Sequence, residues 1–111
     1  DTEQMPEGMV LPDYLPEGYE LAGWEQTADR IESRYENGTG DVILIWQNPL
    51  NSQIVVTQDG ATPTEIAGRT AYLIDNADRK AVIFNNDWNS FIISGNIDIS
   101  ELQIIAESML E

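Results

Sequence analysis

Short strand-like segments, separated by turn residues, make up the middle of the chain. They are rich in β-branched and aromatic residues and are bounded by Gly, Asn, Asp and Pro, which is typical of strands joined by turns. Between the second and third segments, Asn37-Gly38-Thr39-Gly40 predicts a hairpin, because Asn and Gly adopt positive φ at low cost. We therefore expect a meander of antiparallel strands over residues 19–26, 30–36, 41–47, 53–58, 70–75, 81–85 and 90–94.

The last segment changes to a helical period. Its apolar residues, Ile99, Leu102, Ile105, Ala106 and Met109, recur at the spacing of one helix face. Asp98 is placed as the N-cap, and Glu101 three residues later predicts a capping box. The fold class expected is α+β, with a curved antiparallel sheet of about five to seven strands and one C-terminal amphipathic helix packed on one face.

One strand is apolar on both of its faces. Side chains alternate along a strand, so that Val42, Leu44 and Trp46 point one way and Ile43 and Ile45 the other. A single helix covers only one of these faces. The second face is expected to be buried either by sheet curvature together with the N-terminal segment, or by a partner, which is a neighbouring domain or a second copy of the chain.

The chain divides into a lead-in and one domain. Proline at positions 6, 12 and 16 predicts an extended lead-in over residues 1–14, because proline removes a donor and favours extended geometry in its predecessor. The remaining residues, 15–111, are expected to form a single domain, since a chain of 111 residues builds one hydrophobic core. The start at Asp1, without Met, leads us to expect a trimmed piece of a longer protein with an anchor upstream.

Charge narrows the classes of partner. Twenty Asp and Glu against five Lys and Arg give a formal net charge of -15. Nucleic acid is excluded, because phosphate binding needs a basic patch, and an anionic membrane surface is disfavoured for the same reason. Direct membrane insertion is not expected, because no apolar run approaches ~18 residues. The acidity favours a role in solubility, with calcium or a basic partner surface as alternatives.

Composition removes most catalytic chemistry. The sequence has no His and no Cys, which excludes His-based triads, Cys-His pairs and zinc sites with His or thiolate ligands. A Ser-Lys pair would require Lys80, the one lysine of the sequence, next to a turn. No catalytic, cofactor-binding or metal-binding residue is therefore predicted, and the protein is expected not to be an enzyme.

Two polar clusters fall in predicted turns. One comprises Asp75, Asn76 and Asp78, and the other Asn85, Asn86 and Asp87. Turn formation explains both clusters, because Asn and Asp side chains bond to nearby backbone groups. A calcium site is the alternative, since all six side chains are oxygen donors, but neither cluster has the spacing of a calcium-binding loop.

The aromatic residues allow two interpretations. Their size favours positions in the core of a domain that has no disulfides. A stacking platform for sugars or peptides is the alternative, built from Trp24, Trp46, Trp88, Tyr14, Tyr19, Tyr35 and Tyr72.

A series of short motifs resembles a bacterial extracytoplasmic family. In order, they are Leu15-Pro16-Glu17-Gly18-Tyr19, Tyr35-Glu36-Asn37-Gly38, Gly68-Arg69-Thr70-Ala71-Tyr72, Ile93-Ser94-Gly95-Asn96, Glu101-Leu102 and Ile105-Ala106-Glu107-Ser108. The chain resembles the domain of unknown function 4367 over about residues 15–110. It also shows a distant likeness to the C-terminal domain of periplasmic sigma-E regulators. The resemblance implies an exported or cell-surface domain, tethered to a membrane and linked to envelope sensing, with no catalytic residues.

These observations predict a non-catalytic binding, sensing or interaction module of a bacterial membrane-associated protein. Its expected partner is a protein or an envelope ligand, met through the sheet face or the acidic rim. A homodimer through the sheet is a further alternative. Two other functions stay open: a small hydrolase that uses carboxylates, and a purely structural accessory domain.

Overall fold

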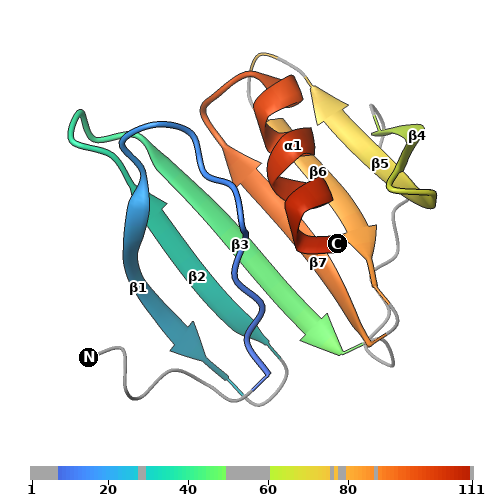
Figure 1. Ribbon diagram of the computed structural model, residues 1–111, viewed down its shortest axis with the longest axis horizontal. Helices are drawn as coiled ribbons and strands as arrows, with labels where there is room; N and C mark the ends of the chain where they lie inside the picture. Colours follow the sequence, from blue (N-terminus) through green and yellow to red (C-terminus); the bar gives the residue numbers. More distant parts are fainter. Residues whose placement is uncertain are drawn as a thin grey trace.

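The computed structural model contains one antiparallel sheet followed by a helix (Figure 1). It describes residues 8–27, 30–49, 61–75, 77, 80–86 and 88–110. Within these residues the strands are β1 (Glu20–Gln26), β2 (Ile31–Glu36), β3 (Val42–Pro49), β4 (Ala61–Ile66), β5 (Arg69–Asp75), β6 (Lys80–Asn85) and β7 (Asn89–Gly95), and the helix is α1 (Ile99–Leu110). The predicted α+β class, with a C-terminal helix on an antiparallel sheet, is confirmed.

The strand order is β1-β2-β3-β7-β6-β5-β4, so the sheet is not the simple meander that the sequence predicts. Three consecutive strands form one half and four form the other, and the two halves join where β3 pairs with β7. The chain therefore passes from β3, near the middle, to β4 at the far edge. Register places Ile45 opposite Ile93 and Gln47 opposite Phe91 at this central pairing.

The edge strand β4 is not predicted from the sequence, because it contains a proline. Pro63 lies opposite Tyr72 on β5, and among the described strands none pairs with the other side of β4. Proline is tolerated on an edge strand because the missing N–H costs no hydrogen bond within the sheet. The strand predicted over residues 53–58 lies outside the described residues.

The hairpin predicted between β2 and β3 is confirmed. The Asn37 side-chain oxygen accepts hydrogen bonds from the backbone nitrogens of Thr39 and Asp41, both at 3.0 Å. Gly40 has a φ of 93°, a conformation that glycine adopts without a steric penalty. The turn aligns β2 and β3 so that Tyr35 lies opposite Ile43.

Helix α1 buries the predicted apolar face against β6 and β7. Asp98 stands at the N-cap, where its backbone oxygen accepts hydrogen bonds from the nitrogens of Glu101 and Leu102. The predicted capping box does not form. The Glu101 carboxylate instead accepts a hydrogen bond of 2.7 Å from the Tyr14 hydroxyl, which links the helix to the N-terminal segment.

The main core lies between the sheet and α1. On β3, Ile43 and Ile45 are fully or almost fully buried on the helix side, whereas Val42, Leu44 and Trp46 on the other side are partly exposed. The prediction that this strand is apolar on both faces is therefore correct. Phe84 and Phe91 stack across β6 and β7 on the helix side, with their ring centroids 5.0 Å apart.

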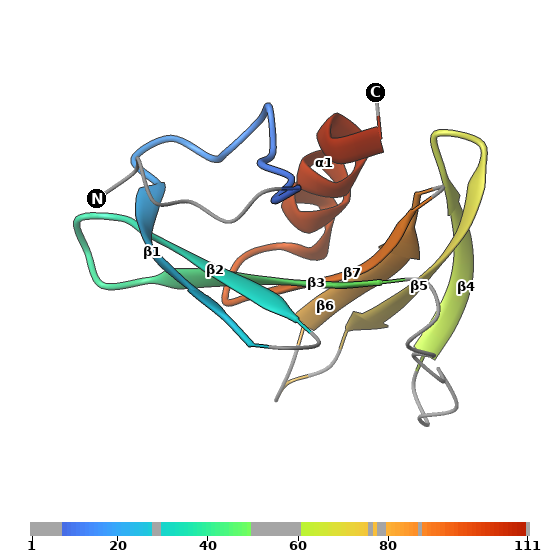
Figure 2. The same ribbon diagram turned by 90° about the horizontal axis from the view of Figure 1, so that it is seen from below.

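The N-terminal segment, residues 8–18, lies on the same side of the sheet as α1 (Figure 2). Val10, Tyr14 and Leu15 pack against the main core, beside the helix. The expectation that this segment buries the second face of the sheet is therefore wrong. The cause is that Gln47 and Ser108, the two side chains that hydrogen-bond to this segment, both lie on the helix side of the sheet.

Two side chains anchor the N-terminal segment through its backbone. The buried amide of Gln47 accepts a hydrogen bond from Val10 N at 2.9 Å and donates one to Gly8 O at 2.8 Å. The Ser108 hydroxyl accepts hydrogen bonds from Asp13 N and Tyr14 N at 3.1 and 3.2 Å. These anchors replace strand pairing for a segment that contains proline, and they complete the cover of one sheet face.

Candidate functional site

The candidate site is the face of the sheet that lies away from α1, and we call it the open face. Within the described part of the chain, α1 and the N-terminal segment both lie on the other side of the sheet (Figure 2). The open face has a continuous apolar centre across β3, β7, β6 and β5, made of Val42, Leu44, Trp46, Tyr72, Ile74, Ala81, Ile83 and Ile92.

Cross-strand register arranges this apolar centre in rows. Trp46 lies opposite Ile92, which lies opposite Ile83, which in turn lies opposite Tyr72. Ile74, Ala81 and Ile83 form a second, small buried cluster, separate from the main core. Direct cross-strand neighbours have Cβ atoms about 4.5–5.5 Å apart, so the side chains of such a row lie against one another. The partly exposed members of the apolar centre are Val42, Leu44, Trp46, Tyr72 and Ile92.

Four glutamates on β1 and β2 border the apolar centre, and we call them the acidic corner. Glu25 lies directly opposite Glu32, and Glu20 directly opposite Glu36. Glu32 is also directly opposite Trp46, so the charged and apolar parts of the face are in contact. A pocket of about 270 Å³ lies here, lined by Gly23, Trp24, Glu25, Glu32 and Arg34.

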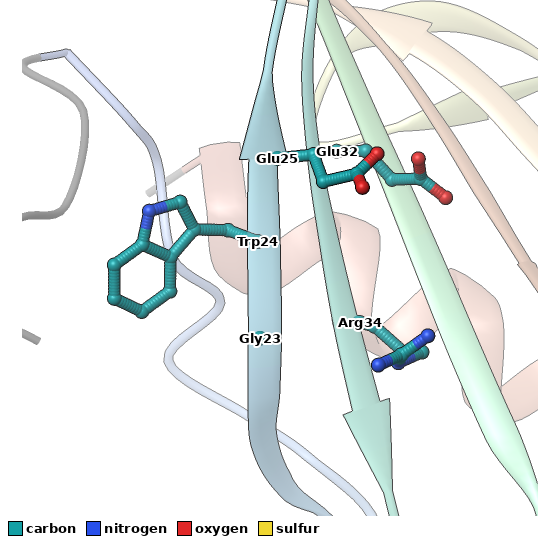
Figure 3. Close-up of a pocket in the computed structure, with 5 residues that line it drawn as sticks. All are labelled: Gly23, Trp24, Glu25, Glu32 and Arg34. Atoms are coloured by element: carbon teal, nitrogen blue, oxygen red, sulfur yellow. The ribbon is translucent and has the colours of Figure 1, made fainter. Parts of the chain in front are cut away.

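The pocket is charged on the open face. In Figure 3, Glu25, Glu32 and Arg34 project to one side of the two strands, and the Trp24 ring projects to the other. Arg34 is paired with Glu36 at 3.1 Å, and both side chains are about half exposed. Neither Glu25 nor Glu32 forms an ion pair within the described residues. Like charges directly opposite each other destabilise a strand pair, so the Glu25–Glu32 pair is unrelieved.

A known family matches the sequence over nearly its whole length. The model of the family described as "Domain of unknown function (DUF4367)" matches residues 9–109. The chain belongs to the DUF4367 family. No curated protein and no solved structure matches the chain at a significant level.

The aromatic residues of this DUF4367 domain do not form one platform. Tyr19 and Tyr35 are buried in the core, as one interpretation of the sequence predicts. Trp46 and Tyr72 stand on the open face, whereas Trp88 is 74% exposed in the turn between β6 and β7. The alternative of a single stacking surface is therefore wrong, and so is a core position for Trp88.

The polar clusters act in turns where the structure describes them. The Asn86 side-chain oxygen accepts hydrogen bonds from Trp88 N and Asn89 N at 2.8 and 2.7 Å. Asn76, Asp78 and Asp87 lie outside the described residues. Elsewhere in the described ranges, no group of three or more acidic side chains could hold a metal ion.

The sequence allows a Ser-Lys pair only at Lys80. In the structure, the Ser94 hydroxyl donates a hydrogen bond to the backbone oxygen of Lys80.

In the described part of the chain, no helix is long and apolar enough to cross a membrane.

Two buried tyrosine hydroxyls are unsatisfied. Tyr35 is 1% exposed and Tyr19 is 9% exposed, and neither hydroxyl has a hydrogen-bond partner among the residues that the structure describes. Burial raises the pKa of both phenols above the ordinary value of 10.0, and Asp41 adds to the rise at Tyr19. The nearby Ser33 hydroxyl lowers the pKa of Tyr35 in part, but its position does not give a hydrogen bond of acceptable geometry to the Tyr35 hydroxyl. These unpaired hydroxyls lower the stability of the core, and we do not assign a binding site to them.

Removing the Tyr35 hydroxyl is expected to stabilise the domain. An unpaired buried polar group costs about 1–3 kcal/mol, so Tyr35→Phe should raise the free energy of unfolding by roughly 1 kcal/mol in urea titrations. Tyr72→Phe, on the partly exposed open face, is the control and should change stability by less than about 0.5 kcal/mol. A loss of stability in Tyr35→Phe would show that the hydroxyl has a partner in solution.

The same variant has a signature at high pH. Because the folded-state pKa of Tyr35 lies above its unfolded value, the fold favours the neutral phenol. That contribution is fully present below about pH 10 and is lost as the pH rises through the folded-state pKa. Tyr35→Phe should therefore lose less stability than the wild type between neutral and strongly alkaline pH.

Proposed function

We propose that this DUF4367 domain is a non-catalytic binding, sensing or interaction module of a bacterial membrane-associated protein. It acts outside the cytoplasm and recognises a protein or an envelope ligand. The observation that carries the proposal is the open face, where an apolar centre touches an acidic corner. Large apolar patches rimmed by polar residues mark interaction surfaces in folded proteins.

The difference in burial between the two faces of the sheet supports this role. One face is closed by α1 and by the anchored N-terminal segment, and it holds the main core. The other carries Leu44, Trp46 and Ile92, which are partly exposed although they contribute nothing to that core. Fold stability explains the first face, and binding explains why the second keeps large apolar side chains.

The place of action rests on resemblance. The sequence motifs are similar to those of exported, membrane-tethered bacterial domains, and the distant likeness to periplasmic sigma-E regulators supports a role in envelope sensing. A chain without cysteine is compatible with an oxidising compartment, because it has no thiol to protect.

A thermal-shift comparison tests the proposal. The purified domain is screened against calcium, glycan and peptidoglycan fragments, lipid vesicles and basic peptides, in parallel with Trp46→Thr. A true ligand at about 100 times its Kd stabilises the native state by ~2.7 kcal/mol, which raises Tm by more than about 5 °C in a domain of this size. We expect a saturable shift in the wild type that Trp46→Thr abolishes.

The control removes an exposed apolar side chain elsewhere. Ile104 is 41% exposed and belongs to α1, which lies on the side of the sheet away from the open face (Figure 2), so Ile104→Thr should keep the shift. A ligand whose shift survives Trp46→Thr but disappears in Ile104→Thr would move the site to the helix and overturn the proposal. Turnover of any panel member by the domain would overturn its non-catalytic part.

A further inference from the structure

We propose that the open face binds an amphipathic basic α-helix of a partner protein. The apolar stripe of that helix lies over β3 and β7, and its lysine or arginine side chains meet the acidic corner. This inference rests on the proposed function, since it names the partner class for the same surface. Three features of the described residues lead to it.

The first feature is the shape of the apolar centre. Leu44 and Trp46 on β3 are partly exposed, and the partly exposed Ile92 continues their row on β7, next to the buried Ile83 on β6. On the other side of the sheet, β6 and β7 are packed by α1, which has 12 residues. A second helix of similar length on the open face would complete a three-layer arrangement, with a helix on each side of the sheet.

The second feature is the lack of backbone partners on this face. The strands β2, β3, β7, β6 and β5 are paired on both sides, so their N–H and C=O groups point to each other. A segment that lies across the face gains no backbone hydrogen bond from it. Such a segment must satisfy its own backbone groups, which an α-helix does and an extended strand does not.

The third feature is charge. Glu25 and Glu32 are directly opposite each other and form no ion pair within the described part of the chain, while Arg34 is paired with Glu36. A lysine or arginine placed between the two carboxylates would relieve their repulsion and fall next to Trp46, which is opposite Glu32. Electrostatic complementarity of this kind fixes the register of an interface and selects its partner.

The charge also argues against a second copy of this chain as the occupant. Each copy has a formal net charge of -15, and a face-to-face pair would bring two acidic surfaces together. Glu65 on β4 adds an exposed carboxylate at the opposite edge of the open face, so a face-to-face pair turned end for end would also bring carboxylates together. Like-charge contacts suppress association.

The experiment uses designed peptides as probes. A labelled helical peptide of about 16 residues carries leucine on one face and lysine on the other, and spans about 24 Å as a helix. Its acidic twin has glutamate in place of every lysine, and a scrambled peptide keeps the leucine and lysine composition without an apolar face. Fluorescence anisotropy at about 50 mM salt should show at least tenfold tighter binding of the basic helical peptide than of either control.

Matched variants locate the contact. Glu25→Gln with Glu32→Gln should weaken binding of the basic helical peptide about tenfold. Asp13→Asn with Glu107→Gln removes the same net charge from exposed positions outside the open face, and should weaken binding less than about threefold. Trp46→Thr should abolish most of the binding, whereas Ile104→Thr should leave it unchanged.

Each contrary result has a definite meaning. Equal weakening by the two charge pairs would overturn the inference, because binding would then depend on total charge. Equal binding of the scrambled peptide would overturn the helical partner, and tighter binding of the acidic twin would overturn the basic one. In those cases the proposed function stands if the thermal-shift ligand still depends on Trp46. Self-association that Trp46→Thr abolishes in light scattering would make the second copy the occupant and overturn the inference.

Discussion

Phe91→Ala is expected to lower the free energy of unfolding by about 3–5 kcal/mol. Phe91 is fully buried at the centre of the helix side of the sheet, where it stacks on Phe84 and lies opposite Gln47. Its removal loses both the transfer free energy of the ring and the contacts around the cavity. Because a domain of this kind is stable by only about 5–15 kcal/mol, the variant should be partly unfolded near 37 °C. Urea titration followed by far-UV circular dichroism measures the effect.

The neighbouring position provides the control. Ile92 follows Phe91 on β7, but its side chain stands on the partly exposed open face. Ile92→Ala should therefore cost clearly less than Phe91→Ala, because fewer contacts are lost. Equal losses in the two variants would mean that the open face is packed as tightly as the core, which would also weaken the case for a partner on that face.

The contrast between Phe91 and Ile92 shows how far a sequence pattern reaches. Alternation along β3 is enough to predict that Ile43 and Ile45 face one way and Trp46 the other, because the side-chain period of a strand is two. The helical period from Ile99 likewise predicts the buried face of α1. These features are local, so they are visible before any strand is paired.

The pairing of strands that are far apart in the chain could not be predicted from the sequence. The contact of β3 with β7 joins residues about fifty positions apart, and the edge position that makes Pro63 acceptable in β4 follows from that order. Without the strand order, a segment with proline at its centre is not recognised as a strand.

The acidic corner depends on register in the same way. Glu25 and Glu32 look like two of twenty acidic residues in the sequence. They become a pair only because β1 has an irregularity between Leu21 and Gly23, which shifts the residues after it relative to β2. A one-residue slip would turn Glu25 to the other face, so this part of the site requires the structure.

Gln47→Leu is expected to lower the free energy of unfolding by about 2 kcal/mol and to release the N-terminal segment. The substitution keeps a buried side chain of similar size but removes the donor to Gly8 O and the acceptor of Val10 N. Each hydrogen bond contributes about 0.5–1.5 kcal/mol, and a backbone group left unpaired in a half-buried position adds to the loss. Urea titration measures the stability, and limited proteolysis measures cleavage within residues 8–18.

Gln26→Leu provides the comparison, because Gln26 is exposed at the end of β1 and its side chain makes no hydrogen bond to any residue that the structure describes. It should change stability by less than about 0.5 kcal/mol and leave the cleavage pattern unchanged. If Gln47→Leu is also silent in both measurements, Ser108 and the core contacts of Tyr14 and Leu15 hold the segment without Gln47. If instead the segment is cleaved but the sheet keeps its stability, the N-terminal segment is a separable cover, and the helix side of β2 and β3 gains exposed surface when it leaves.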